Sequence, residues 1–379
     1  MTANLFEFRT AAVNGDRVRQ ARELRAMTQT TLAEALGVDQ TTVAHIERGT
    51  RQPSSELLDA LVAVLRLPAK FFHQNPAPPL SQGTLLFRAK SGVGKRTINR
   101  ARAQAQIVFE MALKLADKAT TIPVRLPRAS DPIEAAGVIR RLTGAGDGPF
   151  PHLMRATERL GVLIVPLPDC DLCDAFAVWA GTNSDIPVIG FVPGKAPDRS
   201  RMNIAHELGH LILHRAVIGT SATMEREAYQ FAAELLLPAR SITPDLNTEK
   251  LTLFRLAVLK KKWHVSIQAA ARRARELQFI SDRQYRYLMQ QLSRHGWRTA
   301  EPNFGRLEVE RPRALRKMVE VIYGDNPNWG DIGRELSLPA DFLQEITEAY
   351  APAPGAPSEV PSGSSDAADV IPFKRNIQS

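Results

Sequence analysis

Residues 202–214, MNIAHELGHLILH, constrain the fold and chemistry of this chain more than any other stretch. Leucine and isoleucine at helical spacing are typical of a buried helix, yet three histidines and a glutamate stand among them. On a helix His206 and His210 share one face, about 6 Å apart along the axis, which lets both bind one metal ion. Neutral imidazoles favour zinc over magnesium or calcium. The spacing therefore predicts a helical zinc site, with Glu207 aimed at the open coordination position.

Catalytic zinc normally takes three protein ligands, so the sequence must supply one more. His214 lies a further turn along the helix, about 12 Å from His206 and too far to share the ion. We expect it to pack or to support a ligand. Glu225 is the better candidate, because in TMEREAYQFAAELLLP it shares a helix face with Ala228 and Ala232. A carboxylate that faces the core needs a cation. We therefore predict Glu225 as the third ligand, against the competing interpretation of ordinary buried histidines.

The motif H-E-L-G-H followed by E-x-x-A-x-x-F-A-A-x-L-L-x-P resembles the ImmA/IrrE family of zinc metallopeptidases, bacterial proteases that cleave repressors of the helix-turn-helix type. The resemblance implies Zn2+ on His206, His210 and Glu225, with Glu207 as the general base of a hydrolase. A domain that senses a signal without cutting fits the same residues.

This resemblance covers about residues 133–297 and departs from the family at Tyr229. The family usually has Asn or Asp at that position, which orients a histidine ligand through a hydrogen bond. A tyrosine also forms hydrogen bonds but reaches further. We therefore expect Tyr229 to support a ligand from outside the coordination sphere.

Three short apolar runs precede the histidine helix and predict a small sheet, at residues 161–167, 174–181 and 186–192. The last run, IPVIGFV, is expected to be an edge strand that holds an extended peptide by strand addition. The predicted fold class is mainly α, with a small α+β zincin-like domain and an N-terminal all-α helix-turn-helix domain.

Helical patterning continues after Pro238 to about Tyr350. Within it, residues 264–288 form a second passage of helix-turn-helix character. Two interpretations of its arginines stay open: Arg272, Arg273 and Arg275 either contact DNA or belong to a plain helical packing domain.

The segment from Arg17 to Phe72 is rich in helix formers and lacks strand-like alternation. Thr28 is a predicted N-cap for QTTLAEAL, which Gly37 ends, and Asp39 is a predicted N-cap for QTTVAHIERG. Two short helices joined through a glycine are typical of a helix-turn-helix.

The stretch TQTTLAEALGVDQTTVAHIERG resembles the XRE, or lambda-repressor-like, helix-turn-helix family, across about residues 17–72. The resemblance implies a recognition helix in the major groove of a double-stranded DNA operator. Such domains read paired half-sites, so we expect a homodimer; docking of another protein is the competing interpretation. The residues expected to face bases are Gln40, Thr41, Thr42 and His45, and those expected to meet phosphates are Gln29, Arg48 and Arg51.

Composition supports a nucleic-acid partner, since the formal net charge is +9 and the pI is near 9.7. No apolar run reaches the roughly 20 residues that span a bilayer, and the N-terminus shows no secretory signal. We therefore expect a soluble, cytoplasmic protein with no membrane contact. The two cysteines, Cys170 and Cys173, are too few for a closed zinc site and are expected to be reduced loop thiols.

A proline-rich linker at residues 75–83 precedes a basic stretch at residues 87–104, which has six cationic side chains and no acid. This stretch either follows a phosphate backbone or forms a solvated face. Its GVGKRT sequence does not predict a phosphate loop, because Ala89 stands where the first glycine is required and Arg96 replaces Ser or Thr.

These patterns predict a DNA-binding transcriptional regulator whose zinc peptidase domain cleaves a repressor-type protein, either a partner or the chain itself, in a stress or mobile-element response. The alternative is a non-proteolytic transcription factor whose zincin domain acts as a sensor or an antitoxin-like interaction module. The predicted segments are an XRE domain at 1–74, a linker and basic helical segment at 75–132, an ImmA/IrrE-like zinc peptidase core at 133–240, a helical region at 241–350 and a disordered tail at 351–379.

Overall fold

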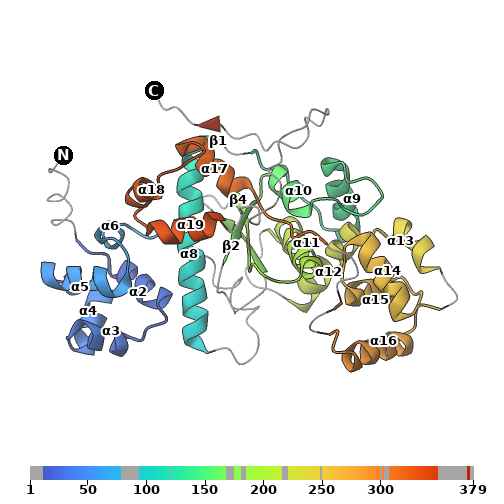
Figure 1. The fold of residues 1–379 in the computed structure, drawn as a ribbon, viewed down its shortest axis with the longest axis horizontal. Coiled ribbons are helices and arrows are strands. Elements are labelled where there is room, and N and C mark those ends of the chain that lie inside the picture. The colour runs from blue at the N-terminus through green and yellow to red at the C-terminus, as the bar shows by residue number, and fades with distance from the viewer. Residues whose placement is uncertain are drawn as a thin grey trace. The chain divides into compact units, whose positions relative to one another are not determined.

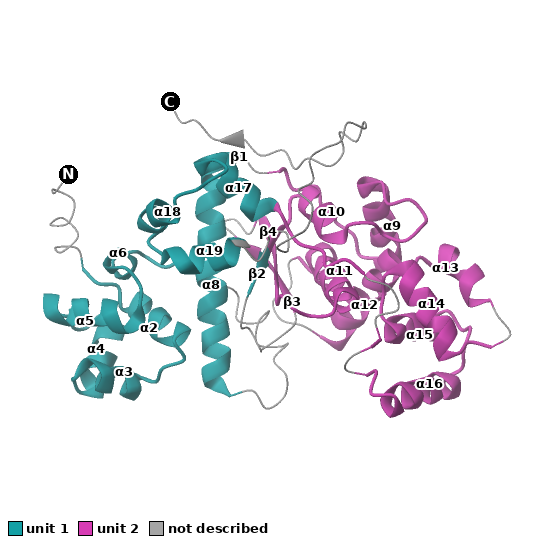
Figure 2. Ribbon diagram, in the orientation of Figure 1, with its two compact units in different colours: residues 1–121, 165–173, 314–379 teal, residues 122–164, 174–313 magenta. Residues whose placement is uncertain are grey.

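The structure is a computed structural model, and it divides into two compact units (Figure 2). Unit 1 comprises residues 1–121, 165–173 and 314–379, and unit 2 comprises residues 122–164 and 174–313. The residues that the structure describes are 12–77, 94–120, 122–167, 175–180, 185–215, 221–247, 250–298, 301–302, 307–348 and the backbone of 374–375.

Unit 1 is almost entirely helical in its described part (Figure 1). Its elements are α2 (Gly15–Leu24), α3 (Gln29–Leu36), α4 (Gln40–Glu47), α5 (Ser55–Leu65), α6 (Ala69–Phe72), α8 (Lys95–Lys118), β1 (Ala119–Thr120), α17 (Ala314–Tyr323), α18 (Trp329–Leu336), α19 (Ala340–Glu348) and β5 (Lys374–Arg375). The strands β1 and β5 pair antiparallel.

Helices α3 and α4 form where the sequence predicts them. The Thr28 side chain accepts a hydrogen bond from the Thr31 amide, which satisfies a free N–H group at the start of α3. Gly37 ends this helix in the left-handed conformation, with φ 65° and ψ 33°, which glycine adopts without steric penalty. The predicted cap Asp39 precedes α4 in an extended conformation but makes no capping hydrogen bond through its side chain.

The long helix α8 runs antiparallel to α2. Near the start of α2, Arg17 forms a buried ion pair of 2.6 Å with Glu110. Toward the end of α2, Glu23 accepts a hydrogen bond of 3.2 Å from Asn99. The start of α2 therefore contacts a later part of α8 than the end of α2 does, so the two helices run in opposite directions. The same two contacts attach the helix-turn-helix to α8.

Unit 2 contains a small sheet covered by helices (Figure 1). Its elements are α9 (Pro132–Thr143), α10 (Leu153–Arg159), β2 (Leu163–Pro166, of which 163–164 fall in this unit), β3 (Ala175–Ala180), β4 (Ile186–Phe191), α11 (Pro197–Leu213), α12 (Ala222–Leu236), α13 (Ala239–Leu246), α14 (Leu253–Trp263), α15 (Ile267–Glu276) and α16 (Asp282–Arg294).

The sheet has the strand order β2-β4-β3, and β3 pairs antiparallel with β4 from Ala175 opposite Phe191 to Ala180 opposite Ile186. All three strands lie within the apolar runs predicted from the sequence. The expectation that IPVIGFV is an edge strand is wrong, because β4 lies between the other two. Strand order follows from long-range pairing, which local hydropathy does not encode.

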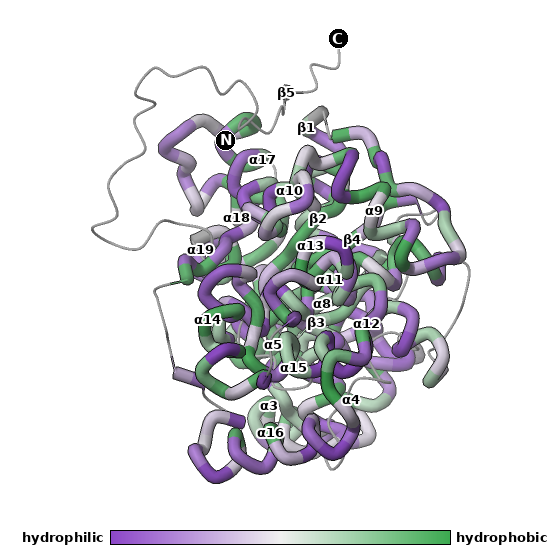
Figure 3. The backbone as a smooth tube through the Cα atoms, turned by 90° about the vertical axis from the view of Figure 1, so that its right-hand side faces the viewer, coloured by the Kyte–Doolittle hydropathy of each residue, from purple (hydrophilic) through white to green (hydrophobic). Residues whose placement is uncertain are grey.

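Helix α11 packs on α12, β3 and β4, and α12 packs on α9, around a core that includes Leu208, Phe231 and Trp263. Hydropathy follows this arrangement in Figure 3, where β2 is mostly green and α16 carries long purple stretches. Within the described residues no helix combines the length and the apolar character needed to cross a bilayer.

Some predictions fall outside the described residues. They include most of the linker at 75–83, the first part of the basic stretch at 87–104, Cys170 and Cys173, and the predicted disordered tail at 351–379 apart from the two residues of β5.

Candidate metal centre and nucleic-acid interface

Helix α11 carries the two predicted histidine ligands on the side that faces α12. It begins at Pro197, which suits the first helical position because proline lacks the N–H group that would stay unpaired there. Ile204 and Leu208 are fully buried on the side of α11 that packs on β3 and β4. The 3.6-residue period then turns His206 and His210 away from the sheet and toward the following helix.

Gly209 sets how closely α11 and α12 approach each other. A Cβ at this position would lie 2.9 Å from Cδ1 of Phe231 and 3.2 Å from the Cα of Ala228. Real Cβ atoms avoid such distances, so the helices reach this separation only with glycine here. The close approach brings Glu225, in the first turn of α12, next to the histidines of α11.

The three predicted ligands meet at one point. The Nε2 atom of His206 lies 3.2 Å from Oε2 of Glu225 and 3.2 Å from Nε2 of His210. The Nε2 atom of His210 lies 3.3 Å from Oε1 of Glu225. Zinc bonds of about 2.0–2.1 Å in tetrahedral geometry place neighbouring donor atoms about 3.3 Å apart. The donor set and its spacing therefore fit three corners of a zinc tetrahedron, and these residues form a candidate metal site.

Glu207 lies on α11 directly after His206 and is only 1% exposed. It is not one of the three residues whose donor atoms cluster. This is the arrangement expected for a carboxylate that takes part in proton transfer while the histidines hold the ion.

His214 supports His210 through its ring. Its Nδ1 lies 3.1 Å from Nδ1 of His210, and its Nε2 lies 2.9 Å from Oε2 of Glu227. If Nε2 of His210 binds the metal, Nδ1 of His210 carries the proton and donates it to His214, whose Nε2–H then donates to Glu227. This chain of hydrogen bonds fixes the tautomer and the ring orientation of a ligand.

Glu227 is the residue that sequence reasoning missed at this site, because helical periodicity assigns it to the polar face of α12. No pattern within α12 identifies it, because its partner His214 lies at the end of α11. His214 contacts His210 and Glu227, and its support of a metal ligand stays a prediction.

Among the described residues, the contact of the Tyr229 side chain is with Arg272 and not with a histidine. Its ring is covered by the guanidinium of Arg272, whose Cζ lies 3.2 Å from the ring centroid. Burial raises the pKa of its hydroxyl above the ordinary value, so the phenol stays protonated. Within the described residues no hydrogen bond joins Tyr229 to a histidine, and the supporting contact comes from His214 and Glu227.

Three arginines of residues 264–288, Arg272, Arg273 and Arg275, are engaged within unit 2. Arg273 is 4% exposed, pairs with Glu234 and donates to the Leu237 carbonyl at 3.0 Å. Arg275 lies over the ring of Tyr285, with its Cζ 4.7 Å from the centroid. The interpretation as a packing domain is therefore the right one for Arg273, because a buried, paired guanidinium does not reach a phosphate.

The recognition helix α4 presents the polar residues that the sequence assigns to DNA. Gln40 and Thr41 are exposed in the first turn of the helix, where groove contact requires them, and His45 is exposed in its last turn. Gln40 donates a hydrogen bond of 2.8 Å to Gln29 of α3. Arg51 donates to Oγ1 of Thr42 at 3.2 Å.

Arg48, which is predicted to meet a phosphate, and His45, which is predicted to face a base, also lie on α4 or directly after it. Arg48 is exposed directly after α4 and donates back to the Ala44 carbonyl at 3.1 Å. His45 has Nδ1 2.9 Å from the Thr50 hydroxyl. The side chains that the sequence assigns to bases and to phosphates therefore belong to one continuous stretch from Gln40 to Arg51, together with Gln29.

A buried ion pair that the sequence analysis did not predict holds α4 on α2. Nε of Arg22 donates to Oε1 of Glu47 at 2.6 Å, and its Nη2 donates to Oε2 at 3.0 Å. Glu47 also accepts from Gln29 at 2.9 Å. A bidentate pair of this kind fixes the angle of the recognition helix.

Comparison with known families finds matches to two separate segments of the chain. Residues 18–72 match the family model described as Helix-turn-helix, and residues 157–275 match the peptidase family model described as IrrE N-terminal-like domain. Curated proteins offer no match to the chain. Both resemblances inferred from the sequence are thereby confirmed. The chain joins an XRE-type helix-turn-helix DNA-binding domain to an IrrE/ImmA-like domain of a peptidase family.

Proposed function

We propose that this chain is a cytoplasmic transcriptional regulator with an active zinc peptidase domain, which cleaves a repressor-type protein in a stress or mobile-element response. The substrate is a partner protein or the chain itself. The observation that carries the proposal is the triangle of donor atoms on His206, His210 and Glu225, at distances of 3.2–3.3 Å that suit tetrahedral zinc. In this proposal residues 133–240 form the peptidase core, and residues 1–74 bind an operator as a homodimer.

Peptide hydrolysis needs a Lewis acid, a water and a group that moves a proton. Bound zinc supplies the Lewis acid, which polarises the peptide carbonyl and lowers the pKa of its water. Glu207 accepts a proton from water, and the resulting hydroxide forms a bond to the acyl carbon. Glu207 then delivers the proton to the leaving amine as the C–N bond breaks, so that no covalent enzyme intermediate forms. His214 and Glu227 hold the His210 ring in place during this exchange.

A metal analysis combined with a cleavage assay tests the proposal. The purified full chain should hold about one equivalent of zinc, and His206→Ala should lose it, whereas His295→Ala, an exposed histidine in unit 2, should retain it. The zinc-loaded chain should cut a co-encoded repressor, and Glu207→Gln should leave that repressor intact while keeping the metal. Cleavage that continues in Glu207→Gln would exclude Glu207 as the base.

The burial of Glu207 favours a second candidate function. A carboxylate with 1% exposure is shielded from water, as in a site that holds a metal for structural or sensing purposes. In this reading the zincin domain is a sensor or an antitoxin-like interaction module of a transcription factor. Zinc retained by the wild-type chain with every candidate repressor left intact would establish this alternative over proteolysis.

A further inference from the structure

The last three helices of unit 1 repeat the first three of the helix-turn-helix domain. Helices α17, α18 and α19 follow one another as α2, α3 and α4 do, and α18 has the same length as α3 (Figure 1). Gly37 ends α3 with φ 65° and ψ 33°, and Ser337 ends α18 with φ 60° and ψ 42°. The Val38 amide donates to the Ala33 carbonyl at 3.0 Å, and the Leu338 amide donates to the Gly333 carbonyl at 3.0 Å. The turns are therefore the same.

The buried side chains of the two helix pairs also correspond, position by position. In both pairs the same places on the first helix and on the second helix face the core, and matching residues share their last two digits. The buried residues are Leu32, Ala33, Val43 and Ile46 in the first pair and Ile332, Gly333, Leu343 and Ile346 in the second. The chain thus contains a second helix-turn-helix at residues 329–348, outside the family match at 18–72.

The exposed face of α19 lacks the side chains with which α4 is expected to contact DNA. Where α4 carries Gln40, Thr41, Thr42 and His45, α19 carries Ala340, Asp341, Phe342 and Glu345. Carboxylates at these positions repel phosphates, so α19 does not bind a nucleic-acid backbone. This face of α19 must serve another purpose.

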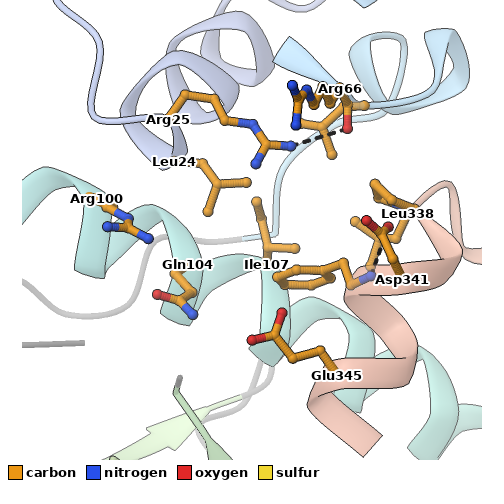
Figure 4. Close-up of a pocket in the computed structure, with 12 residues that line it drawn as sticks. Leu24, Arg25, Arg66, Arg100, Gln104, Ile107, Leu338, Asp341 and Glu345 are labelled. Carbon is orange, nitrogen blue, oxygen red and sulfur yellow. Dashed lines mark hydrogen bonds between the residues drawn. The ribbon is translucent and has the colours of Figure 1, made fainter. Parts of the chain in front are cut away.

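The face of α19 closes one side of a pocket of about 290 Å³ within unit 1 (Figure 4). The opposite side comes from the first helix-turn-helix and from α8, through Arg25, Arg66 and Arg100. Leu24 and Ile107 give the pocket an apolar floor, joined by Phe342 of α19. A small cavity with an apolar floor and a few convergent charged groups is typical of a site for a small molecule.

Charges of opposite sign line this pocket, with Arg25 and Arg66 on one side and Asp341 and Glu345 on the other. Figure 4 shows the Arg25 guanidinium and the Glu345 carboxylate reaching toward the hollow from opposite sides. Within the described residues no ion pair joins Asp341 or Glu345 to Arg25 or Arg66. Arg25 has a pKa below its ordinary value because of burial, and Arg66 and Arg100 lower it further while Asp341 raises it. An anionic group between the arginines would stabilise their charges.

We propose that this pocket binds a small zwitterion with an apolar body, such as a hydrophobic amino acid, as an effector of the DNA-binding domain. Its carboxylate lies between Arg25 and Arg66, its ammonium group faces Glu345, and its side chain covers Leu24 and Ile107. Arg25 directly follows α2 and Arg66 directly follows α5, so the bound molecule bridges the DNA-binding domain and α19. This inference goes beyond the proposed function and depends on neither zinc nor proteolysis.

Calorimetry on the full chain with three probes of one shape tests the assignment. The probes are phenylalanine, 3-phenylpropionate, which lacks the ammonium group, and phenethylamine, which lacks the carboxylate. Phenylalanine should bind at least about 10-fold more tightly than either, because only it bridges both walls. Equal affinity for phenylalanine and 3-phenylpropionate, or no measurable binding of phenylalanine, would overturn the proposal.

Two variants separate the walls of the pocket. Glu345→Gln should lower the affinity for phenylalanine about 10-fold and leave the affinity for 3-phenylpropionate unchanged. Arg66→Gln should lower the affinity for both of these probes, since both carry a carboxylate. Glu34→Gln, which changes an exposed carboxylate of α3 outside the pocket, is the matched control and should bind as wild type does. Thermal unfolding of each variant confirms that it folds. Unchanged phenylalanine affinity in folded Glu345→Gln would overturn the proposed role of α19.

Discussion

Gly209 of α11 lies so close to Phe231 of α12 that a Cβ on the glycine would be 2.9 Å from Cδ1 of the ring. The backbone of Ala228 is also near, with its Cα and O atoms each 3.2 Å from the same point. The contact connects packing with chemistry, since the separation of these two helices sets the distance between His210 and Glu225.

The substitution Gly209→Ala is expected to push α12 away from α11. Alanine favours a helix over glycine by about 1 kcal/mol, but overpacking costs about 1–3 kcal/mol, and the clash dominates because backbone atoms cannot turn aside. We expect lower stability in urea and zinc affinity reduced about 10-fold or more. Gly137→Ala in α9 is the control, because its Cβ meets only Arg141 Nη1 at 3.5 Å. Equal stability and zinc affinity in the two variants would contradict the packing argument.

The hydrogen-bonded chain from His210 through His214 to Glu227 predicts an effect on metal binding without loss of a ligand. Glu227→Gln weakens the acceptor for His214 and should lower zinc affinity about 10-fold to 100-fold, measured by competition with a chelator. Glu134→Gln, at an exposed carboxylate in the first turn of α9, should leave affinity unchanged. If the two variants bind zinc equally well, His214 and Glu227 do not position the ligand.

The recognition helix predicts two kinds of DNA defect. Gln40→Ala and Thr42→Ala should each weaken binding to the specific operator by about 1–3 kcal/mol without unfolding the chain, as expected for lost base contacts. Arg48→Ala should weaken binding to all sequences and reduce the salt slope by about 1. Arg240→Ala, at an exposed arginine of α13 in unit 2, is the matched control. Operator affinity that stays unchanged in Gln40→Ala would show that another surface reads the DNA.

The buried pair of Arg22 and Glu47 predicts a large loss of stability when one partner is removed. Glu47→Gln leaves the guanidinium of Arg22 without its counter-charge, and breaking a buried pair in this way costs about 3–5 kcal/mol. Urea denaturation should show the loss as an earlier midpoint. The exposed pair of Arg334 and Asp331 provides the comparison, since Arg334→Gln should cost less than about 1 kcal/mol.

Local patterns were sufficient to predict which three residues form the candidate metal site. His206 and His210 follow from helical spacing, and Glu225 from the apolar stripe of the next helix, because both depend on the period of a single helix. The caps Thr28 and Gly37 were predicted for the same reason. Glu227 was missed because its partner His214 lies on another helix, and no pattern within α12 indicates that contact.

The second helix-turn-helix escaped sequence analysis although its buried positions match those of the first. Recognition of the first depended on two short helices joined through Gly37, and Ser337 stands at the corresponding position in the second. Helix-turn-helix character was instead expected for residues 264–288, with three of their arginines as candidates for DNA contact. Arg273 is buried there, and charge in a sequence does not distinguish a paired guanidinium from an exposed one.

The middle position of β4 has a consequence for how a substrate is cut. A peptide that adds to this sheet in an extended conformation must align with an outer strand, and β3 is the outer strand attached to α11, through the Trp179 indole N–H that donates to the Leu211 carbonyl at 3.0 Å. For a peptide held there, the number of residues between the anchored segment and the scissile bond is constant. In the proposed peptidase, the register in which a substrate pairs with β3 would therefore decide which of its peptide bonds is cut.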